Sequence, residues 1–143
     1  PGTMPVTLSQ AGITVADNDI IIAGGMTSTG RASREVHIFN VQSLDWRRLP
    51  SIPLGLIAPA LGVLSDGVHV VGGYTNEPLK THSRHYLLAS KARKWQNIEP
   101  LPEARHHAGY AVVDDQLIVM GGAVGSGFFA PFTATDTVYI FKP

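Results

Sequence analysis

The sequence predicts an all-β fold built from about three copies of one four-stranded antiparallel unit. The first observation is a repeated segment: residues 101–122, LPEARHHAGYAVVDDQLIVMGG, align without gaps on residues 4–25, and a weaker copy spans residues 52–73. The second is the spacing of the glycine pairs that end these copies, which lie 48 and then 49 residues apart. The third is that every copy alternates short β-branched runs with turn residues, which is typical of consecutive strands. A fixed period of this length indicates a repeat architecture.

The first copy predicts four strands in chain order. A hairpin is expected first, because two runs rich in β-branched residues flank the turn residues 17–19. A polar loop follows, and then a segment that alternates polar and apolar residues in the period of a half-buried strand. A short fourth strand carries Trp46 and stops before Pro50. The predicted strands are residues 6–16, 20–23, 35–39 and 45–49.

The second copy keeps this order, whereas the third stops after its third strand. Pro59 falls inside the predicted first strand of the second copy, so we expect a bulge or a locally unpaired residue there, because proline has no N–H to donate. The tryptophan that would mark a fourth strand is missing from the third copy. The predicted strands are residues 58–64, 68–71, 84–88 and 94–98 in the second copy and 108–113, 117–120 and 137–141 in the third.

Glycine pairs and tryptophans hold the copies in register. The glycines end the second strand of each copy, where a residue without Cβ allows a positive φ and close approach of a neighbouring backbone. The tryptophans lie 22 and 23 residues beyond the first glycine of their pairs. The residues that we expect to be structural are Gly24, Gly25, Trp46, Gly72, Gly73, Trp95, Gly121 and Gly122.

This combination of motifs resembles the kelch repeat: a hydrophobic run into Gly-Gly, an aromatic residue about 15 positions on, a tryptophan after it and a Leu-Pro before the next copy. The resemblance covers essentially the whole chain and implies blades of a β-propeller, each a four-stranded antiparallel sheet. Leu8 and Leu56 depart from it, since they stand where Arg105 provides the arginine often seen before the first strand. The implied blades are residues 4–51, 52–100 and an incomplete 101–143. Residues 1–3 have no counterpart in the other copies, which is compatible with a cloning remnant.

Fewer than three blades cannot close a propeller, which needs roughly 4 to 8. Two blade faces would then be bare, and something must cover them. One solution is a homodimer that forms a six-bladed ring with its twofold axis along the channel. The other is that these residues are a piece of a longer propeller.

Composition excludes several classes of function. With 11 basic and 11 acidic residues, the chain has no strong field to draw it to nucleic acid or to an anionic membrane, and we expect neither as a partner. No apolar run is long enough for a transmembrane helix, so we expect a soluble chain of undetermined compartment. The absence of cysteine removes disulfides, thiolate metal sites and cysteine nucleophiles.

The titratable residues do not predict catalysis, a metal or a cofactor. His106 and His107 are adjacent, and neighbours in a strand point to opposite faces, so they should not share an ion. His82 and His85 lack an evident third ligand. The acidic residues at 17–19 and 114–115 stand where hairpin turns are expected, and turn chemistry explains them.

The loops between second and third strands are the better candidates, because loops on a rigid scaffold commonly carry binding. On propellers they gather on one face, together with the loops that precede each first strand. The third loop, residues 123–135, is rich in glycine and carries three phenylalanines that either pack over the blade or contact a partner. The candidate binding residues are Arg31, Arg34, Tyr74, Asn76, Lys80, His82, Arg84, Glu103, Arg105, His106, Phe128, Phe129 and Phe132.

Three functional classes remain open. The resemblance favours a non-catalytic module that presents these loops to a protein or peptide. The alternative is a sugar-handling enzyme similar to the kelch-like mutarotases and epimerases, with Glu103, Arg105 and His106 as acid and base. A galactose oxidase reading fails, because that chemistry needs a cysteine-linked tyrosine. A purely structural or assembly role is the third class.

Overall fold

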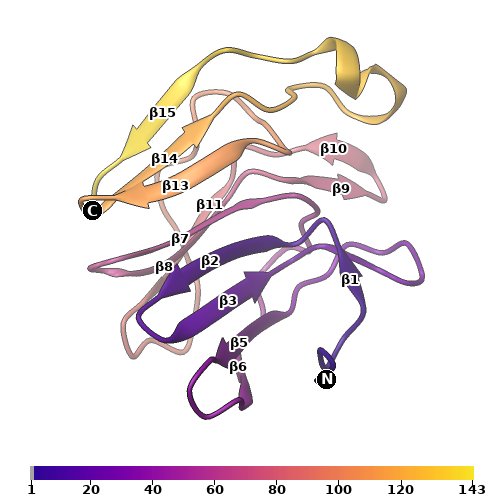
Figure 1. Ribbon diagram of the computed structural model, residues 1–143. Helices are drawn as coiled ribbons and strands as arrows, with labels where there is room; N and C mark the ends of the chain where they lie inside the picture. The colour runs from indigo at the N-terminus through magenta and orange to yellow at the C-terminus, as the bar shows by residue number, and fades with distance from the viewer. Residues whose placement is uncertain (1) are drawn as a thin grey trace.

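The computed structural model describes residues 2–143, which form short antiparallel strands and one short 3-10 helix (Figure 1). The first sheet has the order β2-β3-β5-β6 and the second the order β7-β8-β11-β12, and the third has three strands, β13-β14-β15. The predicted all-β fold with four-stranded antiparallel sheets is therefore confirmed. The strands of these sheets are β2 (Gly12–Ala16), β3 (Asp19–Ala23), β5 (Val36–Asn40), β6 (Trp46–Leu49), β7 (Ala60–Leu64), β8 (Gly67–Val71), β11 (His85–Ala89), β12 (Gln96–Asn97), β13 (Gly109–Val113), β14 (Gln116–Met120) and β15 (Val138–Phe141).

The loops contain more structure than the sequence predicts. β1 (Leu8–Ser9) pairs with β4 (Met26–Thr27), and β9 (Tyr74–Asn76) forms a hairpin with β10 (Leu79–Thr81). The glycine-rich third loop contains the 3-10 helix η1 (Gly127–Phe132). Polar loop composition does not reveal such short pairings, because they depend on which backbone the fold places alongside.

The first strand of each copy begins later than predicted, and one backbone feature explains all three cases. Gln10, Ala58 and His107 occupy the same position of the repeat and have φ values of 54°, 50° and 52°. A residue in this left-handed region cannot continue a strand. Pro59 consequently lies just before β7 and not within it, so the expected bulge is absent from that strand.

The hydrophobic core lies between consecutive sheets. One cluster joins the first and second sheets and includes Ile21, Ile38, Leu61, Val70 and Tyr86. A smaller cluster joins the second and third sheets and includes Leu64, Val71, Leu117 and Val119. The innermost strands stack in sequence, β2 against β7 and β7 against β13, as Figure 1 shows.

The two joints between sheets use the same backbone hydrogen bonds. Ala58 N–H donates to the Gln10 carbonyl (2.8 Å), and His107 N–H donates to the Ala58 carbonyl (3.2 Å). Likewise Gly25 N–H donates to Leu56 (2.8 Å), and Gly73 N–H donates to Arg105 (2.8 Å). Each copy is therefore attached to the next by the same contacts between equivalent residues.

The glycine pairs are required by these joints. Gly24 and Gly72 both have φ of +67°, and a Cβ on them would lie 2.3 Å from the Leu56 carbonyl oxygen and 2.6 Å from that of Arg105. Real Cβ atoms do not approach so closely, and the positive φ itself favours glycine. The sequence therefore needs glycine where each sheet meets the next.

Trp46 and Trp95 are half-buried. Trp46 packs against Phe39, with ring centroids 4.9 Å apart. Trp95 packs against the first core cluster and donates from Nε1 to the Pro50 carbonyl (2.8 Å), which ties the second sheet to the segment that follows the first.

The outer faces of the first and third sheets carry exposed apolar side chains. On β2, Ile13 is 53% and Val15 67% exposed. On the outer face of the third sheet the exposed side chains include Val113, Met120, Val138 and Ile140. Within the part of the chain that the structure describes, no helix combines the length and apolar character needed to cross a membrane.

Candidate functional site

The candidate residues lie on one end of the stacked sheets, which we call the loop face. It combines the loops between second and third strands with the segments before each first strand. Backbone pairs join these two groups in every copy: Leu8 with Thr27 in the first, Ile57 with Tyr74 in the second, and His106 with Ala123 in the third. The loop face comprises residues 8–11, 26–35, 56–59, 74–84, 103–108 and 123–137.

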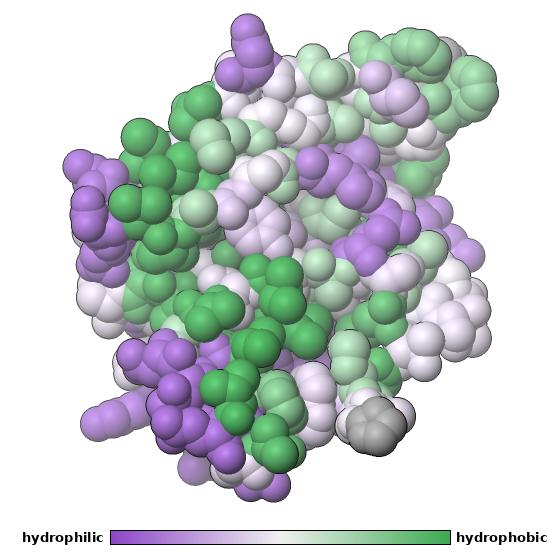
Figure 2. Space-filling view, in the orientation of Figure 1, coloured by the Kyte–Doolittle hydropathy of each residue, from purple (hydrophilic) through white to green (hydrophobic). Residues whose placement is uncertain are grey.

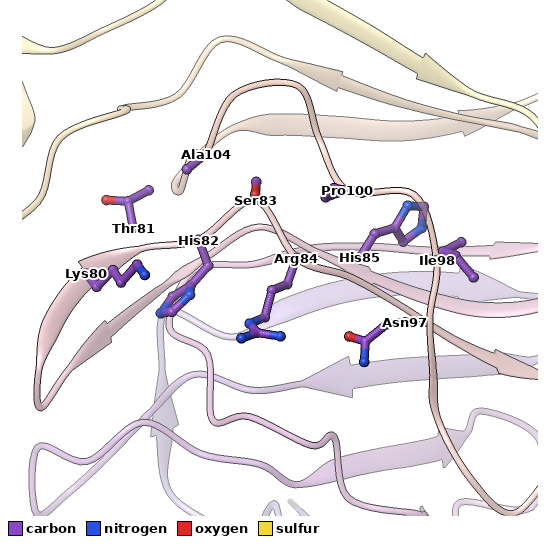
Figure 3. Close-up of a pocket in the computed structure, with 10 residues that line it drawn as sticks. All are labelled: Lys80, Thr81, His82, Ser83, Arg84, His85, Asn97, Ile98, Pro100 and Ala104. Atoms are coloured by element: carbon purple, nitrogen blue, oxygen red, sulfur yellow. The ribbon is translucent and has the colours of Figure 1, made fainter.

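A hollow of about 500 Å³ lies near this face, where β10 passes into β11 (Figure 3). We call it the basic hollow, because Lys80 and Arg84 line it and, among the described residues, no carboxylate does. Figure 3 shows the His82, Arg84 and Asn97 side chains on one side of the chain and Thr81 and Ser83 on the other. The hollow thus combines two permanent cations with hydroxyl and amide groups.

His82 is anchored at the wall of the basic hollow. The Thr75 hydroxyl donates to the Pro78 carbonyl (2.7 Å), so His82 Nε2–H donates to Thr75 Oγ1 (3.0 Å). Burial, followed by the positive charges of Lys80 and Arg84, holds the pKa of His82 below its usual value. His82 is therefore neutral at pH 7 and serves as a hydrogen-bonding group.

His85 closes the inner end of the hollow and belongs to a buried hydrogen-bonded chain. Its Nδ1–H donates to the Glu99 carbonyl (3.2 Å), so Nε2 accepts from His69 Nδ1–H (2.9 Å). His69 Nε2 lies 2.8 Å from Asp66 Oδ1, and the Phe141 ring packs on both imidazoles. Burial, followed by the charge on His69, lowers the pKa of His85 to about 4.

A second hollow, of about 420 Å³, lies between the first and second copies. Arg31, Arg34, Asn76 and Glu77 line it, so it is less one-sided in charge than the basic hollow. Arg34 Nε–H donates to the Ile52 carbonyl (2.8 Å), and the Asn76 amide donates to the Gly30 carbonyl. These bonds fix two of the candidate side chains across the joint.

A third group gathers residues from all three copies. The Tyr74 ring lies 4.9 Å from His106 and 5.9 Å from His107, centroid to centroid. His107 Nε2 is 2.7 Å from the Gln10 side-chain amide, and His106 Nε2–H donates to the Gly125 carbonyl (2.7 Å). The neighbouring imidazoles share a 2.6 Å hydrogen bond through their Nδ1 atoms. They do so because the left-handed backbone at His107 removes the strand alternation that the sequence predicts.

Arg105 is a buried structural side chain. It is 1% exposed and donates to the Gly121 carbonyl (2.9 Å), to Thr137 Oγ1 (2.7 Å) and to Glu103 Oε2 (3.0 Å). Its guanidinium carbon also lies 4.3 Å from the centre of the Tyr139 ring. Through these contacts Arg105 stabilises the third sheet, and its buried side chain is not accessible to a substrate.

Two phenylalanines of the third loop have exposed side chains. Phe128 and Phe132 are 83% and 77% exposed, with ring centroids 6.5 Å apart. The side chain of Phe129 lies outside the described residues. In Figure 2 hydrophobic residues gather at the upper right, where Figure 1 places η1. Thr81 Oγ1 donates to the Gly125 carbonyl (3.1 Å), so this loop lies beside the basic hollow.

Among residues 2–143, no three or more His, Asp or Glu side chains are grouped so that they could hold a metal ion.

Comparison with known proteins decides the family. The family model described as "Kelch motif" matches residues 7–53, the first copy. The chain belongs to the kelch-repeat family. The same three sheets are thus kelch blades, the third with three strands.

Relatives extend this similarity across the other kelch repeats. The chain is 29% identical to Kelch-like protein terF of Aspergillus terreus, over 83% of this chain and 28% of that protein. It is 29% identical to Beta-scruin of Limulus polyphemus, over 93% of this chain and 15% of the relative. It is 25% identical to Kelch repeat and BTB domain-containing protein 2 of Cowpox virus, over 84% and 21% of the two chains. The chain thus spans less than a third of the length of these relatives.

Sequence reasoning missed several residues of the loop face and of the basic hollow. Gln10 could have been found, because it shares the repeat position of His107. Thr81 and Ser83 stand between candidates that were named. Asn97 gave no signal, since it lies in β12 and reaches the basic hollow only through the pairing of β12 with β11.

Proposed function

We propose that this chain is a kelch-type binding module that presents its loop face to a protein or peptide partner. The observation that carries the proposal is the grouping of candidate side chains into two adjoining hollows on one rigid edge. Lys80, His82 and Arg84 share one hollow, and Arg31, Arg34 and Asn76 share the other.

Residue type supports the same proposal. Arginine and aromatic residues are enriched among the side chains that dominate binding energy at protein interfaces. Here exposed arginines line the hollows, and the exposed Phe132 lies on η1 beside them. Exposed phenylalanines on a loop gain stability when a partner covers them.

The module also needs its outer faces covered. We propose that further kelch repeats do this, supplied by a second copy of the chain or by the rest of a longer propeller. The repeated joint supports this, because Gly25 and Gly73 each donate an N–H across a joint between sheets. Gly122 stands at the equivalent position of the third copy. The exposed apolar rows on the first and third sheets support it as well.

Peptide selection tests the binding proposal. Peptides selected from a random library on the immobilised chain should bind saturably in fluorescence anisotropy. Arg31→Ala together with Phe132→Ala should weaken that binding at least about tenfold, the loss expected when one or two interface contacts go. Both side chains are exposed, so the variant should fold normally.

The matched control changes the opposite end of the sheets. Gln42 lies in the turn after β5 and Arg93 in the turn after β11, and both are exposed. Gln42→Ala with Arg93→Ala should leave peptide affinity unchanged. Selected peptides that respond equally to both variants would contradict binding at the loop face.

A further inference from the structure

Charge is distributed unevenly over a chain whose basic and acidic residues balance, at 11 each. Among the described residues the ion pairs involve Glu35, Asp19, Asp66 and Glu103, and neither Lys80 nor Arg84 takes part in one. Both side chains are exposed at the basic hollow. Two cations in one concave site without a carboxylate create a local positive potential that favours an anionic ligand.

The spacing of these cations favours a ligand with separated charges. Lys80 lies in β10, and Arg84 directly precedes β11. In extended backbone, four residues span at most about 13 Å. A peptide with acidic side chains at alternate positions can reach both cations, because those side chains share one face of an extended chain.

Neutral groups complete the site. His82 donates to Thr75 from Nε2, which leaves Nδ1 as an acceptor for a ligand. The Ser83 hydroxyl and the Asn97 amide line the same hollow. Among the described residues its lining includes no Phe, Tyr or Trp, and so none of the aromatic rings on which nucleobases stack. A polar wall with cations is suited to carboxylates and to peptide amides.

We propose that the basic hollow binds an acidic peptide segment through its carboxylates, with Lys80 and Arg84 as the charged contacts. This inference rests on the proposed function and names the chemistry of the partner. Guanidinium binds a carboxylate through paired N–H donors, and the lysine ammonium provides a point charge. The exposed loop with Phe132 lies beside the hollow and extends the contact surface.

A dye-labelled peptide of alternating Glu and Ser tests the proposal on the 143-residue chain by fluorescence anisotropy. We expect saturable binding that weakens as salt rises, and no binding of the same peptide with Gln in place of Glu. Lys80→Gln with Arg84→Gln should weaken binding about fivefold to thirtyfold, as expected for the loss of two partly exposed ion pairs.

The matched control is Arg93→Gln with Lys94→Gln, which removes the same charge from exposed positions in the turn before β12. Its affinity for the acidic peptide should stay within about twofold of the parent chain, since screened charges this far away contribute little. An equal loss in both double variants would overturn the proposal, because the attraction would then be unspecific. Equal melting temperatures of the two variants confirm that folding is unaffected.

Inorganic phosphate serves as the probe for a single-anion site. We expect it to displace the peptide only weakly, through general screening. Displacement at concentrations comparable with the peptide would overturn the two-contact arrangement. If selected library peptides remain sensitive to Arg31→Ala with Phe132→Ala but not to Lys80→Gln with Arg84→Gln, the acidic-peptide inference fails while the binding module stands.

Discussion

At the scale of single residues, one position of the repeat accepts opposite chemistry. Leu56 is fully buried in the second copy, and the equivalent Arg105 is equally buried in the third. Arg105 is tolerated because carbonyl and hydroxyl groups of Gly121 and Thr137 accept its donors. From sequence alone the arginine suggested a binding residue, since arginine is almost never fully buried unless it is paired.

Arg105→Leu tests this structural role. The variant copies the residue of the second repeat but leaves buried acceptors unpaired, so the free energy of unfolding should fall by about 2–4 kcal/mol. Glu103→Gln, at the 47% exposed partner, should cost less than about 1 kcal/mol. Urea denaturation measures both, and a fully stable Arg105→Leu variant would show that these hydrogen bonds contribute nothing.

His85 predicts a pH dependence of stability. Its pKa is lowered from 6.5 in the unfolded chain to about 4 by burial and by the neighbouring His69 charge. The unfolded state therefore binds more protons between these values, so stability is complete above pH 6.5 and is lost as the pH falls toward 4. This difference corresponds to about 3 kcal/mol.

His85→Asn should remove most of that loss, while the lowered pKa values of His82 and His107 leave a residual dependence. Denaturation in urea at several pH values between 4 and 6.5 provides the measurement. Parallel curves for the parent chain and the variant would exclude His85 as the source.

At the scale of elements, the sequence predicted every strand of the three sheets but not where each first strand begins. Alternating apolar residues and turn signals specify that a strand exists. The strand begins after the left-handed residue at Gln10, Ala58 or His107. The sequence would have predicted this backbone conformation only if glycine stood at these positions. The β9-β10 hairpin and η1 arise from contacts with neighbouring copies, which local composition cannot encode.

The candidate site was predictable in part for the same reason. Lys80, His82 and Arg84 were found because the repeat locates the loop that carries them. Their grouping with Asn97 required the pairing of β12 with β11. Which candidates are buried, as Arg105 is, depends on partners such as Thr137 that lie far away in the sequence.

Gly72→Ala tests the joint between the second and third sheets. The substitution adds strain at φ +67° and places Cβ 2.6 Å from the Arg105 carbonyl oxygen. We expect a loss of about 3 kcal/mol or more in the free energy of unfolding. Gly30→Ala is the matched control, because Gly30 also has a positive φ of +78° but its Cβ would meet nothing within 4 Å.

That control should cost only about 1–2 kcal/mol, the price of the left-handed backbone. Thermal unfolding followed by circular dichroism separates the two variants. Equal losses would mean that the close approach of the Arg105 backbone does not restrain the joint.

At the scale of the whole molecule, the three blades form an open stack. Each internal joint buries one face of a sheet and repeats the same backbone hydrogen bonds. The two outer faces expose Val15 and Ile140 at 67% and 57%. Exposed apolar rows of this kind favour association with another apolar surface. The internal joints show that a neighbouring kelch sheet provides such a surface.

The most direct test is the mass of the isolated chain in solution, measured by light scattering over a wide dilution range. We expect a species of twice the 15.3 kDa chain mass that dissociates on dilution. Val15→Lys with Ile140→Lys should give a folded monomer, because a charge on each outer face opposes contact. A parent chain that stays a 15.3 kDa monomer at every concentration would contradict covering of its outer faces by a second copy of the chain.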